Sequence, residues 1–255
     1  MSERITIKSA SQHELMRRAG ALTGETLAYL GTLVKPGITT KQLDEAAEAY
    51  IRSHGGIPSF LNYEGFPASI CASVNEQVVH GIPSKKCVLK DGDIISIDCG
   101  AIVEGFHGDA ARTFLVGEVA PEVVKLVEVT KECFFKGLEQ AQVGNHICDI
   151  SRAIEAHATA HGYGIVREMV GHGIGSSMHE APEVPNYWTV RMGRGTRLCP
   201  GMAIAVEPMI NLGERYIDFL PDGWTCVARD RKPSAHYENT IFITENGPEV
   251  LTNPI

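Results

Sequence analysis

The sequence predicts an α+β fold made of two similar halves, in which helices cover antiparallel strands. The strand-like run 90–98 recurs as 199–207, at an offset of 109 residues. The helix-like segment 37–55 recurs as 144–162, at an offset of 107. Each half also has the same order: a helix pair, a histidine loop and two acid-bearing strands. This duplication predicts a pseudo-twofold fold, with the helices outside a central curved sheet.

Two helices are expected in the first half. Residues 11–14 (SQHE) form a capping-box pattern. An apolar stripe follows at spacings of three or four residues and consists of Leu15, Ala19, Leu22, Thr26, Leu30 and Leu33. Pro36-Gly37 ends this helix. The second helix begins at the 39–42 cap (TTKQ) and ends at Gly55-Gly56.

Two further helices are expected in the second half. Pro121 opens the third helix, whose stripe consists of Val123, Val127, Thr130, Phe134, Leu138 and Ala141. Ile150, Ile154 and Ala158 indicate the fourth, which ends at His161-Gly162. His54 and His161 therefore fall at the ends of matching helices, where a positive charge interacts favourably with the helix dipole.

The strands carry four acids. Ile95 and Ile97 alternate with Ser96 and Asp98, which is typical of a half-buried strand, and a glycine-rich turn over 100–108 leads to Asp109. The second half repeats this arrangement with Glu207 and Glu238. Neighbouring carboxylates repel each other unless a proton or a cation lies between them. Solvated acids on surface hairpins are the alternative, but the recurrence in both halves favours a metal site.

Three histidines accompany these acids. His172 lies between glycines, which leave its imidazole unobstructed, although a structural loop histidine is the alternative. The expected ligand set is Asp98, Asp109, His172, Glu207 and Glu238. It favours Mn, Fe(II), Co or Zn, and two such ions would activate a water molecule, as in a hydrolase. His80 and His179 occupy matching loops before the strands; a pair of buried structural histidines is the alternative for them.

Composition and charge exclude several classes of protein. The 255 residues contain no low-complexity linker, so we expect one domain over 11–255, with pseudo-repeats at about 11–118 and 119–250 and a tail at 1–10. The net charge of −8, without a basic block, argues against nucleic-acid binding. We find no transmembrane run and no signal peptide. Seven scattered cysteines indicate a reduced, cytoplasmic chain, and we expect a monomer.

Six local motifs carry a resemblance to a known family. They are 63–71 (YEGFPASIC), 75–83 (NEQVVHGIP), the Asp98/Asp109 hairpin, 171–175 (GHGIG), 206–208 (VEP) and 236–240 (HYENT). Together they resemble the type I methionine aminopeptidases of peptidase family M24, from about residue 11 to the end. The resemblance implies the pita-bread fold and a single catalytic domain. The short N-terminus resembles the bacterial form, without the zinc-binding extension of eukaryotic type I enzymes.

The resemblance also implies an activity. The family removes the initiator methionine when the second residue is small, by attack of a metal-bridging water or hydroxide on the scissile carbonyl. The five ligands would bind two divalent ions (Co, Mn, Fe(II) or Zn), and Glu207 would also carry the proton to the leaving amine. His179 would hydrogen-bond the scissile carbonyl, and His80 would contact the scissile amide. Nascent polypeptide N-termini at the ribosome would be the partners.

A methionine side chain requires an apolar pocket. By position, its lining would comprise Phe60, Tyr63, Phe66, Cys71, His80, Met178 and Trp224. The family often has Cys at the position of Phe60 and Phe at that of Met178, so the pocket shape of this chain departs from the usual pattern. Asn75 and Ser234 match positions where the family can hold a monovalent cation through backbone oxygens.

Two alternative interpretations of the function are compatible with the same fold. A prolidase or aminopeptidase P-like enzyme usually carries an extra N-terminal domain, whereas about ten residues precede the first helix here. A pita-bread protein without metals could act as a binding module. The intact ligand set argues against that second interpretation.

Overall fold

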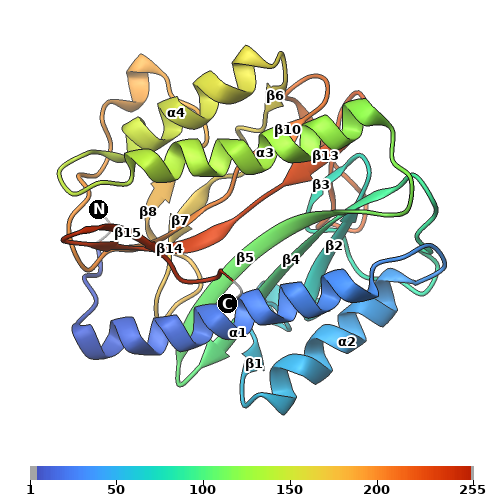
Figure 1. Cartoon of the computed structure of the whole chain (residues 1–255), viewed down its shortest axis with the longest axis horizontal. Coiled ribbons are helices and arrows are strands. Elements are labelled where there is room, and N and C mark those ends of the chain that lie inside the picture. The colour runs from blue at the N-terminus through green and yellow to red at the C-terminus, as the bar shows by residue number, and fades with distance from the viewer. Residues whose placement is uncertain (1–4, 254–255) are drawn as a thin grey trace.

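A computed structural model describes residues 5–253, and Figure 1 shows its helices on two opposite sides of the strands. The helices are α1 (Ala10–Leu33), α2 (Thr40–Ser53), α3 (Pro121–Gln140) and α4 (Ile147–Ala160), with the 3₁₀ turns η1 (Tyr63–Gly65) and η2 (Val190–Met192). All four predicted helices are confirmed. Among the described residues, no helix combines the length and the apolar character that a membrane span requires. Residues 1–4 of the expected tail lie outside the described part.

The described strands form four sheets, and every ladder in them is antiparallel. In the first sheet, β4 (Ile94–Val103) pairs with β5 (Phe106–Leu115) on one side and with β1 (Ile57–Pro58) and β2 (Ile70–Val74) on the other. The second follows the order β15 (Gly247–Val250), β14 (Asn239–Thr244), β9 (Ala203–Val206), β7 (Gly171–Gly173) and β8 (Glu180–Val184). The third contains β13 (Ser234–His236), β10 (Met209–Asn211) and β6 (Gly164–Ile165), and the fourth β11 (Ile217–Phe219), β12 (Cys226–Ala228) and β3 (Gln77–Val79).

The helix caps agree with the sequence except at the first. Thr39 and Gln42 form the predicted capping box of α2, and Pro121 begins α3. The prediction of a cap at Ser11 was wrong, because Ser9 caps α1 and its partner is Gln12. Both serines precede a suitable third residue, so the sequence pattern alone fits either. The helix begins two residues earlier because the backbone of Lys8 is hydrogen-bonded to Gly201, which fixes the entry of the chain.

Matched glycines show the same backbone conformation in the two halves. The φ angles are +93° and +92° at Gly37 and Gly144, +79° and +75° at Gly55 and Gly162, and +91° and +89° at Gly92 and Gly201. Glycine adopts this left-handed region at little cost, whereas other residues are strained there. The two halves therefore have matching turns at three places. These turns precede the second helix of each half, follow that helix, and precede β4 in the first half and β9 in the second.

The β4–β5 hairpin places two acids together. Its turn consists only of Glu104 and Gly105, both with positive φ as in a type I′ turn, so the strands extend further than the predicted 100–108 turn allowed. Asp98 pairs with Ala111, and Asp109 pairs with Gly100, so the two acids lie on one face and are diagonal neighbours. This face is more buried than the half-buried pattern suggested, because the second half of the chain covers it.

Each helix pair packs on its own core. In the first half, α1 and α2 bury a cluster with β4 that includes Leu27, Leu30, Leu43, Ile51, Ile95 and Ile97. In the second half, α3 and α4 bury a cluster with β9 and β14 that includes Leu126, Phe134, Ile150, Ile154, Ile204 and Ile241. The helices therefore cover the outer faces of the strands and leave the inner faces to meet each other.

Strand β5 joins the halves by hydrogen bonds to the segment that leads into β14. Ala111 and Glu238 exchange backbone hydrogen bonds of 3.3 and 3.0 Å. The hydroxyl of Thr240 accepts from the backbone N–H of Asp109 at 3.0 Å and donates to its carbonyl at 2.9 Å. Arg112 donates to the carbonyl of Glu238 and to the side chain of Asn239. These bonds fix Asp109 and Glu238 side by side.

Replacing Thr240 with Val is expected to destabilise the fold by about 1–3 kcal/mol, because two buried backbone groups of Asp109 lose their partner. Thr240→Ser keeps the hydroxyl and loses only a methyl group, so it should cost less. Urea unfolding at constant m value measures the difference. Equal losses in the two variants would show that the hydroxyl bridge contributes nothing.

Candidate metal centre

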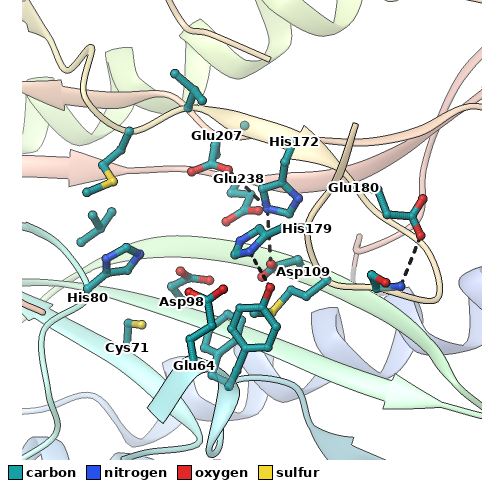
Figure 2. A pocket seen from close by; sticks show the side chains of 18 of the residues that line it. Glu64, Cys71, His80, Asp98, Asp109, His172, His179, Glu180, Glu207 and Glu238 are labelled. Carbon is teal, nitrogen blue, oxygen red and sulfur yellow. Dashed lines mark hydrogen bonds and ion pairs between the residues drawn. The ribbon is translucent and has the colours of Figure 1, made fainter. Parts of the chain in front are cut away.

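A cavity of about 670 Å³ opens at the join of the two halves. Figure 2 shows four carboxylates converging in it, those of Asp98, Asp109, Glu207 and Glu238. Asp98 lies on β4 and Asp109 on β5, whereas Glu207 directly follows β9 and Glu238 directly precedes β14. Each half therefore contributes two acids, as the repeat predicts.

His172 lies beside this acid group and comes from β7, not from a loop. Its Nε2 atom is 3.7 Å from Glu207 Oε1 and 3.9 Å from Asp109 Oδ2, too far for hydrogen bonds. Its Nδ1 atom is 2.9 Å from the carbonyl of Gly173, so Nδ1 carries the proton. The lone pair of Nε2 consequently faces the carboxylates, which is the orientation of a histidine ligand with a backbone partner.

The site offers two overlapping groups of candidate ligand atoms. Asp98, His236 and Glu238 form one group, and Asp109, His172 and Glu238 form the other, with atoms within 4.8 Å of one another in each. Glu238 belongs to both. Since one carboxylate can bridge two cations, this arrangement fits a pair of metal ions better than a single one.

Unsatisfied polar atoms point to the same conclusion. Buried oxygens without a hydrogen-bond partner are Asp98 Oδ1, Asp109 Oδ1 and Glu238 Oε1. Buried polar groups are normally paired, and each exception requires an explanation. Divalent cations would satisfy these oxygens, so the residues fit the metals that the sequence predicts.

Burial dominates the electrostatics of the acids. It raises the pKa of Asp98 to about 7. The pKa values of Asp109, Glu207 and Glu238 are also raised well above the usual range, first by burial and then by repulsion from neighbouring carboxylates. Without a cation, protons must therefore neutralise part of the group. With a cation, all four carboxylates can ionise, which is the form that binds metal.

The histidines are held neutral. Burial, followed by the nearby His179, lowers the pKa of His172 and that of His80 to about 4. A neutral imidazole can coordinate a metal or donate one hydrogen bond and accept another, whereas an imidazolium cannot coordinate. The cavity therefore provides imidazoles in the useful protonation state at neutral pH.

His236 is a candidate functional residue that the sequence analysis left unassigned. It lies on β13, is 2% exposed, and has both ring nitrogens without a hydrogen-bond partner. Its Nε2 atom is 3.7 Å from Glu238 Oε2. The signal was present in the 236–240 motif, where His236 precedes Glu238 by two residues, but spacing along the chain did not reveal that both side chains face the cavity.

Figure 2 shows His80 to the left of the acid group, whereas His179 overlaps the acids in this view and lies beside His172. The ring of His179 lies edge-on to that of His172, with centroids 4.3 Å apart. The hydroxyl of Tyr63 is 2.9 Å from His179 Nδ1. If Tyr63 donates this bond, His179 carries its proton on Nε2 and can donate from there. Tyr63 was predicted as a pocket residue, and this second contact was not foreseen.

The cavity also has an apolar side. The buried cluster there consists of Phe60, Phe66, Ala68, Cys71 and Met178, with Tyr63, Ile82 and Trp224 packed against it. Trp224 packs edge-on against Phe66, with ring centroids 5.1 Å apart. All seven residues predicted for the methionine pocket line the cavity. The acid group and the apolar cluster therefore share one space.

The start of the chain packs against the cavity rim. Lys8 Nζ is 2.8 Å from Glu180 Oε2, and the Thr6 hydroxyl donates to the same carboxylate. Glu180 in turn accepts a bond from the backbone N–H of Ser177. These contacts tie the loop that contains His179 to the N-terminal segment. The Lys8–Glu180 pair could not be predicted from local patterns, because the two residues are 172 positions apart.

Buried acids around two overlapping ligand groups define a metal-dependent hydrolase site. Comparisons with known proteins agree. Residues 14–245 match the model of metallopeptidase family M24. The methionine aminopeptidase of Clostridium acetobutylicum is 54% identical over 97% of this chain and 98% of its own length, and methionine aminopeptidase 1 of Bacillus subtilis is 48% identical over 97% and 99%.

Solved structures agree as well. Methionine aminopeptidases from Rickettsia prowazekii and Thermotoga maritima superpose with TM-scores of 0.94 and 0.95, at 42% and 39% identity, over 98% of this chain and all of theirs. An Xaa-Pro dipeptidase from Bacillus anthracis shares the fold, with a TM-score of 0.77 at 24% identity, and this chain covers 62% of it. The chain therefore belongs to metallopeptidase family M24, among its methionine aminopeptidases, and has their pita-bread fold.

The metal-free protein is expected to lose thermal stability as the pH rises through about 7, the folded pKa of Asp98. Raised carboxyl pKa values mean that the folded chain holds protons that the unfolded chain has released, so stability falls as the pH rises through the folded values. The histidines His80 and His172 are already neutral in the folded chain, and above about pH 6.5 they are mostly neutral in the unfolded chain as well, so they do not offset this loss. A divalent metal should raise the melting temperature most at the higher pH. A metal-free melting temperature that stays constant or rises would contradict this account of the site.

Proposed function

We propose that this chain removes the N-terminal methionine from newly made proteins when the second residue is small. The observation that carries the proposal is the shared cavity, in which a buried acid group with candidate metal ligands adjoins an apolar cluster of aromatic and sulfur-containing side chains. Such a cluster suits a thioether. The membership in a family of metallopeptidases supports the same reaction.

The proposed metal ligands are Asp98, Asp109, His172, Glu207 and Glu238. Glu207 is outside the two candidate ligand groups but has its Oε1 atom 3.7 Å from His172 Nε2, and His236 lies close to Glu238. The five proposed ligands would hold two divalent ions of the Mn, Fe(II), Co or Zn class, since the set is rich in oxygen and contains no thiolate. Bound ions would supply Lewis-acid activation of water and of the scissile carbonyl. Neighbouring carboxylates in a buried space support this occupancy.

Glu207 is the proposed proton carrier. Its carboxylate lies in the acid group, with one oxygen 3.7 Å from His172 Nε2. As a base it would accept a proton from the attacking water, and as an acid it would return that proton to the leaving amine. A carboxyl group whose pKa responds strongly to its neighbours suits both directions of transfer.

His179 and His80 are proposed to contact the reacting peptide bond. His179 would donate a hydrogen bond from Nε2 to the scissile carbonyl oxygen and stabilise the charge that develops on it. Tyr63 would act as a positioning residue, because its hydroxyl at Nδ1 selects this tautomer. His80, which also lines the cavity, would contact the scissile amide.

Substrate selection would follow from the apolar side. The methionine side chain would contact Phe60, Tyr63, Phe66, Cys71, His80, Met178 and Trp224, all of which line the cavity. The family often has Cys where this chain has Phe60, and Phe where it has Met178. The aromatic and the sulfur-containing side chain are therefore exchanged between these two positions. The pocket would therefore keep the same chemistry with a different shape.

Four finer points stay predictions. The partners would be nascent N-termini at the ribosome, and the chain would act as a cytoplasmic monomer. A monovalent cation could bind near Asn75 and Ser234, where Asn75 has a φ of +54° and its carbonyl accepts a 2.9 Å bond from the N–H of Ser234. A carbonyl oxygen has a second lone pair for a cation.

Release of methionine from short peptides tests the proposed function. EDTA-treated protein should release methionine from Met-Ala-Ser but not from Met-Lys-Ser, and only after addition of Mn, Co, Fe(II) or Zn. Asp98→Asn should remove the activity and leave the circular dichroism spectrum unchanged. Release only from peptides with proline second would point to the aminopeptidase P branch, and no release with any metal would overturn the proposal.

Tyr63→Phe should lower kcat about 2- to 10-fold, because a hydrogen bond of about 0.5–1.5 kcal/mol no longer selects the tautomer of His179. KM should change less, since the ring remains in the pocket. Nitrogen-15 NMR of the histidines provides the independent readout, in which the Nδ1 signal of His179 should shift. A lower kcat with an unchanged His179 signal would rule out the positioning role.

A further inference from the structure

A second cluster of metal-ligating side chains lies outside the cavity. It consists of Glu132 on α3 with His157 and His161 at the end of α4. One candidate ligand atom from each residue lies within 4.8 Å of the other two. None of the three lines the cavity, and α3 and α4 lie side by side on the outside of the fold (Figure 1). The proposed peptidase reaction gives this cluster no role.

The geometry of α4 brings the two imidazoles together. Residues four apart lie on the same helix face, and the rings of His157 and His161 have centroids 4.8 Å apart. His161 Nδ1 is 2.9 Å from the carbonyl of His157, so Nδ1 carries the proton and Nε2 keeps its lone pair. A backbone carbonyl that fixes the tautomer in this way is a common partner of histidine ligands.

Glu132 supplies the third group from the neighbouring helix. Its Oε2 atom is 2.8 Å from His157 Nε2, and this contact is the main cause of its lowered pKa. The carboxylate is therefore ionised at neutral pH. The nearby Lys125, which would oppose a cation, is paired with Glu128 at 3.5 Å.

We propose that Glu132, His157 and His161 bind one divalent transition-metal ion of the zinc class on the outer surface. Two imidazoles and one carboxylate are a known zinc ligand set, and the fourth position would be open to water. Ligand atoms around tetrahedral zinc, with bonds of about 2.1 Å, lie roughly 3.4 Å apart. The observed spacing requires only small rotations of partly exposed side chains. The bound ion would cross-link α3 and α4.

The first half of the chain provides an internal comparison. Tyr50 and His54 occupy the places of His157 and His161 at the offset of 107. His54 Nδ1 likewise lies 2.8 Å from the carbonyl of Tyr50, and the two rings stack with centroids 4.1 Å apart. The helix end is therefore built in the same way, but the second imidazole is missing. His54 thus serves as a matched control.

Zinc binding at equilibrium tests the site. Dialysis of the whole protein against zinc, with bound metal measured by mass spectrometry, should give one ion fewer per chain in His161→Ala and His157→Ala than in the unchanged protein. His54→Ala should bind as much zinc as the unchanged protein. Equal zinc in all four proteins would overturn the proposal. Methionine release should be unaffected in all variants, so failure of this site and failure of the proposed peptidase function are distinguishable.

Exposure provides a second test. The untagged protein should be retained on immobilised Ni²⁺, since a surface pair of histidines can reach the resin whereas the ligands in the cavity cannot. His157→Ala and His161→Ala should elute at a lower imidazole concentration, and His54→Ala should elute like the unchanged protein. An equal loss of retention in His54→Ala would assign the binding to scattered surface histidines and overturn the proposal.

Discussion

The main physical constraint on this structure is the free-energy cost of burying four carboxylates close together. Asp98, Asp109, Glu207 and Glu238 repel one another, and burial disfavours each charge further. Such a group is stable at neutral pH only with protons or cations between the oxygens. The helices cover the outer faces of the strands, and the two apolar cores are buried between helices and strands. The inner faces of the strands are left to form the polar centre.

The join between the halves determines how close the acids come. The backbone bonds between Ala111 and Glu238, and the Thr240 hydroxyl at Asp109, hold two of the carboxylates from opposite halves side by side. Neither half alone contains a complete ligand group, because Glu238 belongs to both groups and the other members come from both halves. The complete ligand groups therefore exist only where the two halves meet.

Much of this could be predicted from the sequence, because the relevant signals are local or repeated. Helix caps, turn glycines and the strand that ends in Asp98 or Glu207 recur in matching local sequence in the two halves, and this recurrence identified the helices and the acid group. What escaped prediction depends on contacts between distant segments. His236 is held beside the centre on β13, which pairs with β10. Ser9 replaces Ser11 as the cap where the backbone of Lys8 meets Gly201. The Tyr63–His179 and Lys8–Glu180 contacts are of the same kind.

The choice of acid in each half has a physical reason. Asp98 and Asp109 lie inside a regular ten-residue ladder, where the strands themselves bring short side chains to the centre. Glu207 and Glu238 lie just beyond the ends of β9 and β14, and an extra methylene group allows them to reach the same point. The longer side chain also has one more rotatable bond. A glutamate at a strand end is thus better suited than the two aspartates to the proton transfer that we propose for Glu207.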